Sequence, residues 1–177
     1  LGVLHRMPGR APTDFIAKVG LGPTLLNMAI TGGIGTGYVL AVGGDLNGPV
    51  VGTIFSIVGF AAFGKHTFNI VPVMAGVFLA SLTVPWHVTE PSILFAALFG
   101  TALSPIPGQF GPHWGVVAGF LHSCVVLTVG TLTAGLNLYN NGFAAGIVAS
   151  VLVPVIVAWR RRREQPRESS QSACDAD

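Results

Sequence analysis

The segment that decides the fold is Gly142–Arg163, with the sequence GFAAGIVASVLVPVIVAWRRRR. It carries no charged residue up to Trp159, and four consecutive arginines follow. A helix of roughly 17–25 apolar residues crosses the hydrocarbon core of a bilayer. Tryptophan is enriched at the membrane–water interface, and lysine and arginine are enriched on the cytoplasmic side. This segment therefore predicts a transmembrane helix whose C-terminal end lies in the cytoplasm.

Charge is scarce along the rest of the chain as well. Only 9% of the 177 residues are charged, whereas an ordinary soluble domain carries roughly 25%. Between Val19 and Trp159 the charged residues are Asp45, Lys65 and Glu90. This composition excludes a soluble globule, a disordered chain and a coiled coil. It also excludes a nucleic-acid binder, because the basic residues lie at the chain ends and not on one face. We expect an all-α, polytopic membrane protein.

Six apolar segments follow one another, at residues 23–42, 48–63, 71–84, 91–103, 113–132 and 142–159. The first, fifth and sixth are long enough to span a bilayer, the second is marginal, and the third and fourth are short and bordered by prolines. Irregular backbone at membrane depth survives only inside protein or beside a wet cavity. The short segments therefore either span with the help of their flanks or re-enter as broken helices. The expected architecture is a membrane helix bundle of about six segments.

Basic residues at both ends of the chain set the expected topology. Arg6, Arg10 and Lys18 precede the first segment, and the four arginines follow the last. Because such residues favour the cytoplasmic side, we expect a multi-pass protein of the cell (inner) membrane with both termini in the cytoplasm. The polar tail from Glu164 is expected to be disordered. The expected divisions are a cytoplasmic N-terminal segment (1–18), a membrane domain (19–159) and a basic, then polar cytoplasmic tail (160–177).

Glycines recur at helical spacing. Residues four apart share one face of a helix, and small residues there let helices approach closely in lipid. This spacing favours a helix-packing role over contact with a ligand. The helix-packing candidates are Gly111, Gly115, Gly119, Gly142 and Gly146.

One polar cluster follows the second apolar segment and contains Lys65, His66 and Asn69. Polar groups in hydrocarbon must find partners, and ionisable ones are functional candidates. The alternative is that Lys65 anchors the topology by reaching the headgroups while Asn69 caps the next helix. Both interpretations stay open from the sequence.

A second polar cluster precedes the sixth segment and contains Asn137, Tyr139, Asn140 and Asn141. Asparagine amides both donate and accept hydrogen bonds, which suits a neutral polar solute or the coordination shell of an ion. Tyr139 alone would suit the membrane interface. We interpret this break, together with the first cluster, as a candidate solute-binding region.

Two further polar features are weaker. His122, inside the fifth segment, is either bonded to a neighbouring helix or a titrating group in a pathway. The stretch 104–113, SPIPGQFGPH, is either a surface turn or a loop that dips into the membrane. We include His122 among the candidate binding residues.

Enzyme motifs are missing from the sequence. It shows no nucleophile elbow and no His–Glu metal spacing, and Asp45 and Glu90 are the only carboxylates near membrane depth. We expect no enzyme, no metal site and no cofactor. The leading hypothesis is a channel or secondary transporter for a small polar solute or ion. The alternative is a structural or assembly membrane protein. The expected partners are the lipid bilayer and that solute or ion, without nucleic acid, and a homo-oligomer stays open.

Three motifs resemble those of a known family. They are Gly64-Lys65-His66 with the Asn69, Pro72 and Gly76 that follow, then 99–105, FGTALSP, and 137–146, NLYNNGFAAG. Over Asp14 to Pro154 the chain resembles a family of bacterial multi-pass membrane proteins known as a domain of unknown function. Members of that family are usually considerably longer, with further membrane segments upstream. The resemblance therefore implies that this chain matches their C-terminal portion, and it implies no substrate.

Overall fold

The computed structural model describes residues 2–7, 13–83, 87–129 and 137–174. These residues contain helices and no strand, so the prediction of an all-α chain is confirmed. Each predicted apolar segment contains a helix. In chain order the helices are α1 (Gly2–His5), α2 (Phe15–Val19), α3 (Leu21–Ala41), α4 (Gly48–Phe60), α5 (Thr67–Thr83), α6 (Pro91–Phe99), the 3-10 helix η1 (Gly100–Leu103), α7 (Pro105–Phe110), α8 (Pro112–Thr128) and α9 (Asn137–Cys174).

Prolines in the middle of the chain begin helices. Pro91, Pro105 and Pro112 occupy the first turns of α6, α7 and α8. The N–H groups in the first turn of a helix have no acceptor within the helix, so proline, which lacks an N–H, loses no hydrogen bond there. The fixed φ of proline also suits this position. The stretch 104–113, which we expected to be a turn or a dipping loop, is therefore mostly the helix α7. It ends at Gly111, whose φ of 103° joins α7 to α8 in a conformation that favours glycine.

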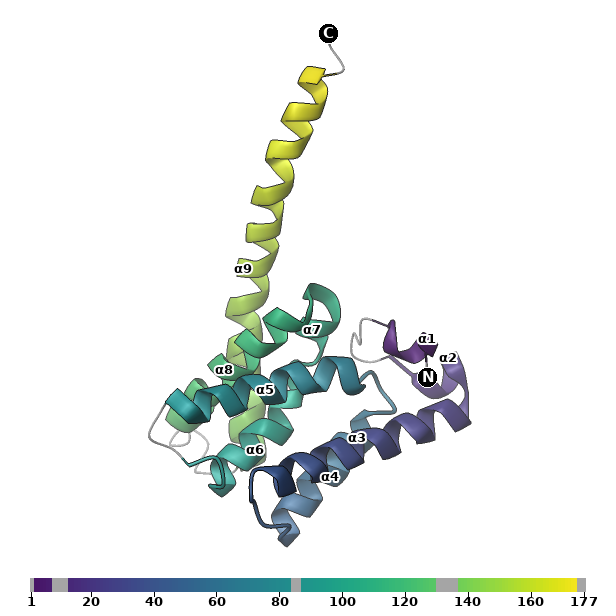
Figure 1. Ribbon diagram of the computed structural model, residues 1–177, viewed down its shortest axis with the longest axis vertical. Coiled ribbons are helices and arrows are strands. Elements are labelled where there is room, and N and C mark those ends of the chain that lie inside the picture. The colour runs from purple at the N-terminus through teal and green to yellow at the C-terminus, as the bar shows by residue number, and fades with distance from the viewer. Residues whose placement is uncertain (1, 8–12, 84–86, 130–136, 175–177) are drawn as a thin grey trace.

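Within the part of the chain that the structure describes, two helices are long and apolar enough to cross a membrane, namely Leu21–Ala41 and the part of α9 from Tyr139 to Arg163. This is compatible with a membrane location, but the expected membrane bundle of about six apolar segments, spanning or re-entrant, is not confirmed. The helix α6 has nine residues and is about 14 Å long, which is well short of about 30 Å of hydrocarbon. In Figure 1, α9 stands upright, α5 runs across the view, and α3 runs obliquely beside α4. The helices therefore do not form one parallel bundle.

The helix α5 is the centre of the core. Val73, Met74 and Val77 each join a different cluster of buried apolar side chains. The neighbouring helix α6 is buried at every position from Ile93 to Leu98. A helix that is apolar all round belongs in the interior. The short fourth segment is therefore an enclosed core helix, which explains its apolar composition without a bilayer crossing.

Close approach of α5 and α8 depends on two glycines. A Cβ at Gly76 would collide with the carbonyl oxygen of Val116, and a Cβ at Gly119 would collide with that of Val73. A Cβ at Gly115 would lie 2.7 Å from side-chain atoms of Pro72 and Pro107. Small residues thus let the two backbones touch.

The other predicted packing glycines do not pack helices together in this structure. Gly111 lies at the joint between α7 and α8, outside the regular turns of either helix. Gly142 and Gly146 lie on α9, and a Cβ at either would meet nothing within 4 Å. The spacing that placed them on one face is real, but that face has no neighbouring helix among the described residues.

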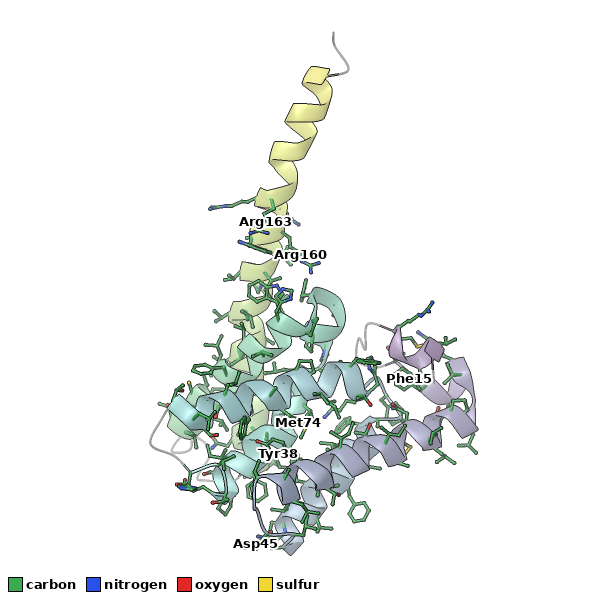
Figure 2. All side chains as sticks on the ribbon, in the orientation of Figure 1. Phe15, Tyr38, Asp45, Met74, Arg160 and Arg163 are labelled. Atoms are coloured by element: carbon green, nitrogen blue, oxygen red, sulfur yellow. The ribbon has the colours of Figure 1, made fainter. Side chains whose placement is uncertain are left out.

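Both ends of the chain contain helices, and the N-terminal segment packs against the rest of the protein. In the N-terminal segment, Leu4 and Phe15 are fully buried, and the Phe15 N–H donates to the Ala62 carbonyl at 3.0 Å (Figure 2). At the other end, α9 continues to Cys174 where we expected a disordered tail. Once a helix exists, each added residue gains one hydrogen bond for the dihedral angles it fixes. A helix already formed in the apolar segment can therefore extend through the polar residues that follow.

Candidate functional site

The turn between α4 and α5 carries the first polar cluster, and two asparagines hold it. The Asn27 amide of α3 donates to the carbonyls of Ala61 and Lys65, both at 2.8 Å. Asn69 accepts from the His66 N–H at 2.8 Å and donates to the Gly64 carbonyl at 2.9 Å. Asn69, the third residue of α5, therefore reaches back to the N–H of the residue before the helix, as the third-position side chain of a capping box does. It has the capping role that the sequence suggested, from inside the helix. The turn is a rigid platform.

Lys65 points from this platform into the protein. Its side chain is only 8% exposed. Its Nζ donates to Oγ1 of Thr101 in η1 at 2.8 Å, and it lies 5.1 Å from the centre of the Phe60 ring. Thr101 in turn donates to the Leu98 carbonyl at 2.6 Å, so its oxygen is oriented to accept from the lysine. The anchor interpretation, in which Lys65 reaches the headgroups, is wrong for this geometry.

No carboxylate among the described residues pairs with Lys65. Lys65 lies in a turn outside both candidate spans. Burial lowers the pKa of its ammonium group to about 8, because removal from water disfavours the charged form. A buried cation without a counter-ion is costly, so this position is the most unusual one in the site.

A pocket of about 150 Å³ opens beside the lysine. Its walls are mostly apolar, with Lys65 as the charged group and Ser104 as the hydroxyl side chain. The lining residues are Phe60, Phe63, Gly64, Lys65, Ala102, Ser104 and Pro105. The pocket therefore combines one ammonium group with walls that would strip water from a small ligand.

The second polar cluster surrounds His122 of α8, which is fully buried. Its Nε2 lies 3.0 Å from Oδ1 of Asn141. Because that oxygen only accepts, the hydrogen bond places the ring proton on Nε2. The ring Nδ1 and the Ser123 hydroxyl are buried and have no hydrogen-bond partner in the described part of the chain. Asn140 donates to the Val126 carbonyl at 3.0 Å, which ties α9 to α8.

The helix η1 brings the two clusters together. Thr101 binds Lys65, and the adjacent Gly100 lies against His122, since a Cβ there would be 2.8 Å from the imidazole Cδ2. Lys65 and His122 thus contact adjacent residues of one short helix. The sequence did not single out Thr101 or Gly100 as site residues. The signal was there, because a Gly-Thr pair interrupts the short apolar fourth segment.

Other predicted site residues lie elsewhere. His66 turns away from the Lys65 pocket, and its Nε2 lies 3.0 Å from the Met7 carbonyl of the N-terminal segment. Tyr139 is 66% exposed on α9. Asn137 begins α9, so the predicted break is the first turn of that helix. The side chain of Asn137 lies outside the described part of the structure.

Comparison with known protein families bears on the resemblance that the sequence motifs indicated. A family described as "Protein of unknown function (DUF1576)" matches residues 1–158. The chain belongs to this family. The match extends beyond the span from Asp14 to Pro154 over which the motifs suggested a resemblance, and it covers nearly the whole chain. No curated protein and no solved structure matches.

Proposed function

We propose that this DUF1576 chain is a channel or secondary transporter for a small polar solute or ion, with Lys65 at its binding position. The observation that carries the proposal is a buried lysine on a pocket, without a carboxylate partner among the described residues. Ionisable groups kept in apolar surroundings are costly and usually serve a ligand or an ion path. The buried His122, which lies against Gly100 of η1 and bonds to Asn141, would extend the path toward α9.

The proposed location is the inner membrane of a bacterium, with both termini in the cytoplasm. The two apolar helices and an aromatic–basic cluster support it. Trp159 packs edge-on against Trp114, with the two ring centres 5.8 Å apart. The guanidinium carbon of Arg163 lies 4.0 Å from the centre of the Trp159 ring. Figure 2 shows Arg160 and Arg163 on α9, near the level where this helix leaves the body. Such groups favour the cytoplasmic membrane interface. The resemblance further suggests that the chain corresponds to the C-terminal portion of longer family members.

A structural or assembly role is the second candidate, and one observation favours it. The amides of Asn27, Asn69 and Asn140 donate to backbone carbonyls of this chain. These bonds hold helix ends together, and a solute would have to compete with them. In this candidate the exposed apolar face of α9, with Val151 and Val155, would meet lipid or a partner helix.

Flux through reconstituted protein separates the two candidates. The panel contains sodium, potassium, nitrate, glycerol and urea, each measured across proteoliposomes of wild type, Lys65→Met and Lys18→Met. Lys18 is exposed on α2 and does not line the pocket. Lys18→Met is therefore the matched control, because it makes the same substitution outside the proposed site. We expect at least one solute to be carried by wild type and Lys18→Met, with flux at least about tenfold lower in Lys65→Met. Wild type that carries no member of the panel would exclude the transport proposal for these solute classes and favour the structural role.

A further inference from the structure

We infer that the Lys65 pocket binds a singly charged anion, so that the solute of the proposed transporter is anionic. The inference rests on the proposed function for its role in transport, but binding to the pocket is measured separately from flux. Its basis is the number of hydrogen-bond donors and charges that the described side chains leave open.

The ammonium group of Lys65 has donors to spare. A protonated lysine has three N–H donors and no acceptor. The described residues accept one of them, at Oγ1 of Thr101, and Phe60 offers only a ring face. The Thr101 proton is committed to the Leu98 carbonyl, so Thr101 positions the lysine without competing for a ligand. The remaining donors belong to a side chain that lines the pocket.

No carboxylate of the described residues supplies a negative charge beside the Lys65 ammonium group. Asp45 lies in the turn before α4 (Figure 2). Lys65 lies in the segment between α4 and α5. Thirteen helical residues separate the two turns, which corresponds to about 20 Å. Glu90 accepts from the His87 N–H at 3.2 Å, at the start of α6. Asp14 is exposed and accepts from the Ala17 N–H at 3.0 Å. Since none of these carboxylates pairs with Lys65, the lysine needs its counter-charge from outside the described chain.

The charge and the walls together select the class of anion. One ammonium group balances one negative charge, whereas a divalent anion would leave a net charge in an apolar pocket, which is costly. The walls are mostly apolar, so an anion that loses water easily, such as nitrate, is favoured over a strongly hydrated one such as sulfate. The phosphodiester of an anionic lipid headgroup has the same single charge, and it is the second source to be tested.

The described residues of the neighbouring helices present no titratable side chain to Lys65. The elements packed against Lys65 present Asn27 from α3, Phe60 from α4 and Thr101 from η1. None of these side chains changes charge. The neighbouring His66 is directed to the Met7 carbonyl of the N-terminal segment. Lys65 is thus the group whose protonation would control anion binding.

Thermal unfolding of the full chain in neutral detergent tests the inference. Wild type, Lys65→Met, Lys65→Arg and Lys18→Met are melted in sodium nitrate, sodium sulfate and sodium gluconate at equal ionic strength. Nitrate at about 100 times its Kd should raise the melting temperature of wild type by about 5 °C relative to gluconate. Lys65→Arg and Lys18→Met should keep the shift, Lys65→Met should lose it, and sulfate should give little.

A second arm identifies the source of the anion. Phosphatidylglycerol or phosphatidylcholine is added to the gluconate samples. A Lys65-dependent shift with phosphatidylglycerol but not with nitrate assigns the site to a lipid headgroup, whereas a shift with nitrate assigns it to a free anion. If Lys65→Met does not fold, wild type alone decides, because the shift should disappear when the pH rises from 7 to 10 and the lysine loses its proton.

The outcomes separate this inference from the proposed function. Lys65-dependent shifts without flux of any panel member support the anion site and contradict transport. Flux of a cation or a neutral solute, with neither probe giving a Lys65-dependent shift, supports transport and overturns the anion inference. A nitrate shift that is equal in wild type and Lys65→Met is a general salt effect and also overturns it.

Discussion

At the scale of the residue, Lys65 makes stability depend on pH. Burial lowers its pKa from 10.5 to about 8. Between these values the folded state binds fewer protons than the unfolded state, so the free energy of unfolding rises as the pH is raised from 8 to 10.5. Below pH 8 both states are protonated, and the cost of burying the charge, up to about 3 kcal/mol, is fully present.

Denaturant unfolding of wild type and Lys65→Met at pH 7 and pH 10.5, in gluconate, checks this expectation. The stability of wild type relative to the variant should improve by up to about 3 kcal/mol at the higher pH. Other titrating groups cancel in the difference, because they are common to both proteins. A difference that is the same at both pH values would contradict a buried, charged lysine.

Asn140 should matter for stability, because its amide serves the fold. Its Nδ2 donates to the Val126 carbonyl across the α8–α9 junction, and the side chain is buried. If Asn140 lined a wet site, as the sequence alone suggested, the Asn140→Ala substitution would lower the stability of the protein only slightly. In this geometry Asn140→Ala leaves a buried carbonyl without that donor, which should cost about 1–3 kcal/mol. Tyr139→Ala, at the exposed neighbour, should change stability by less than about 0.5 kcal/mol. Equal melting temperatures for the two variants would contradict the conclusion that the Asn140 amide stabilises the fold.

At the scale of the element, the crossing of α5 and α8 is the tightest contact of the fold. Gly119→Ala should destabilise the protein by about 1–3 kcal/mol or more, because the new methyl group meets the Val73 carbonyl, and backbone cannot swing aside as a side chain can. Gly146→Ala is the matched control on α9. It meets open space and should be neutral or stabilising by up to about 1 kcal/mol, since alanine is the better helix former.

Thermal melts in detergent compare the two glycine variants directly. The expected order is Gly119→Ala below wild type and Gly146→Ala at or above it. A loss of stability at Gly146 as large as at Gly119 would mean that a partner helix covers α9, for example in a homo-oligomer. Unchanged stability at both positions would show that the α5–α8 contact is looser than the geometry indicates.

At the scale of the whole molecule, the orientation of α9 gives the clearest test of topology. Tyr139 and Arg163 lie at the two ends of its candidate membrane span. In a background with both native cysteines replaced by serine, Tyr139→Cys should react with a membrane-impermeant thiol reagent added to intact cells. Arg163→Cys should react only after permeabilisation, because the arginine cluster favours the cytoplasm. The opposite pattern would reverse the proposed topology, and labelling of both in intact cells would exclude a crossing by α9.

Local sequence patterns were enough to show that the apolar segments contain helices and which polar positions are costly. The apolar segments and the polar residues Lys65, Asn69 and His122 depend on such patterns, which are visible within one helix or turn. The helical state of 105–110 and of the polar tail was not predicted. The contacts of these residues depend on how distant segments pack against one another. Lys65 and Thr101 are 36 positions apart, and no periodicity links them. The same limit hid the enclosure of α6, because hydropathy shows that a segment avoids water without showing whether lipid or protein replaces it. Packing of η1 between two polar clusters turned a list of isolated polar residues into one candidate site.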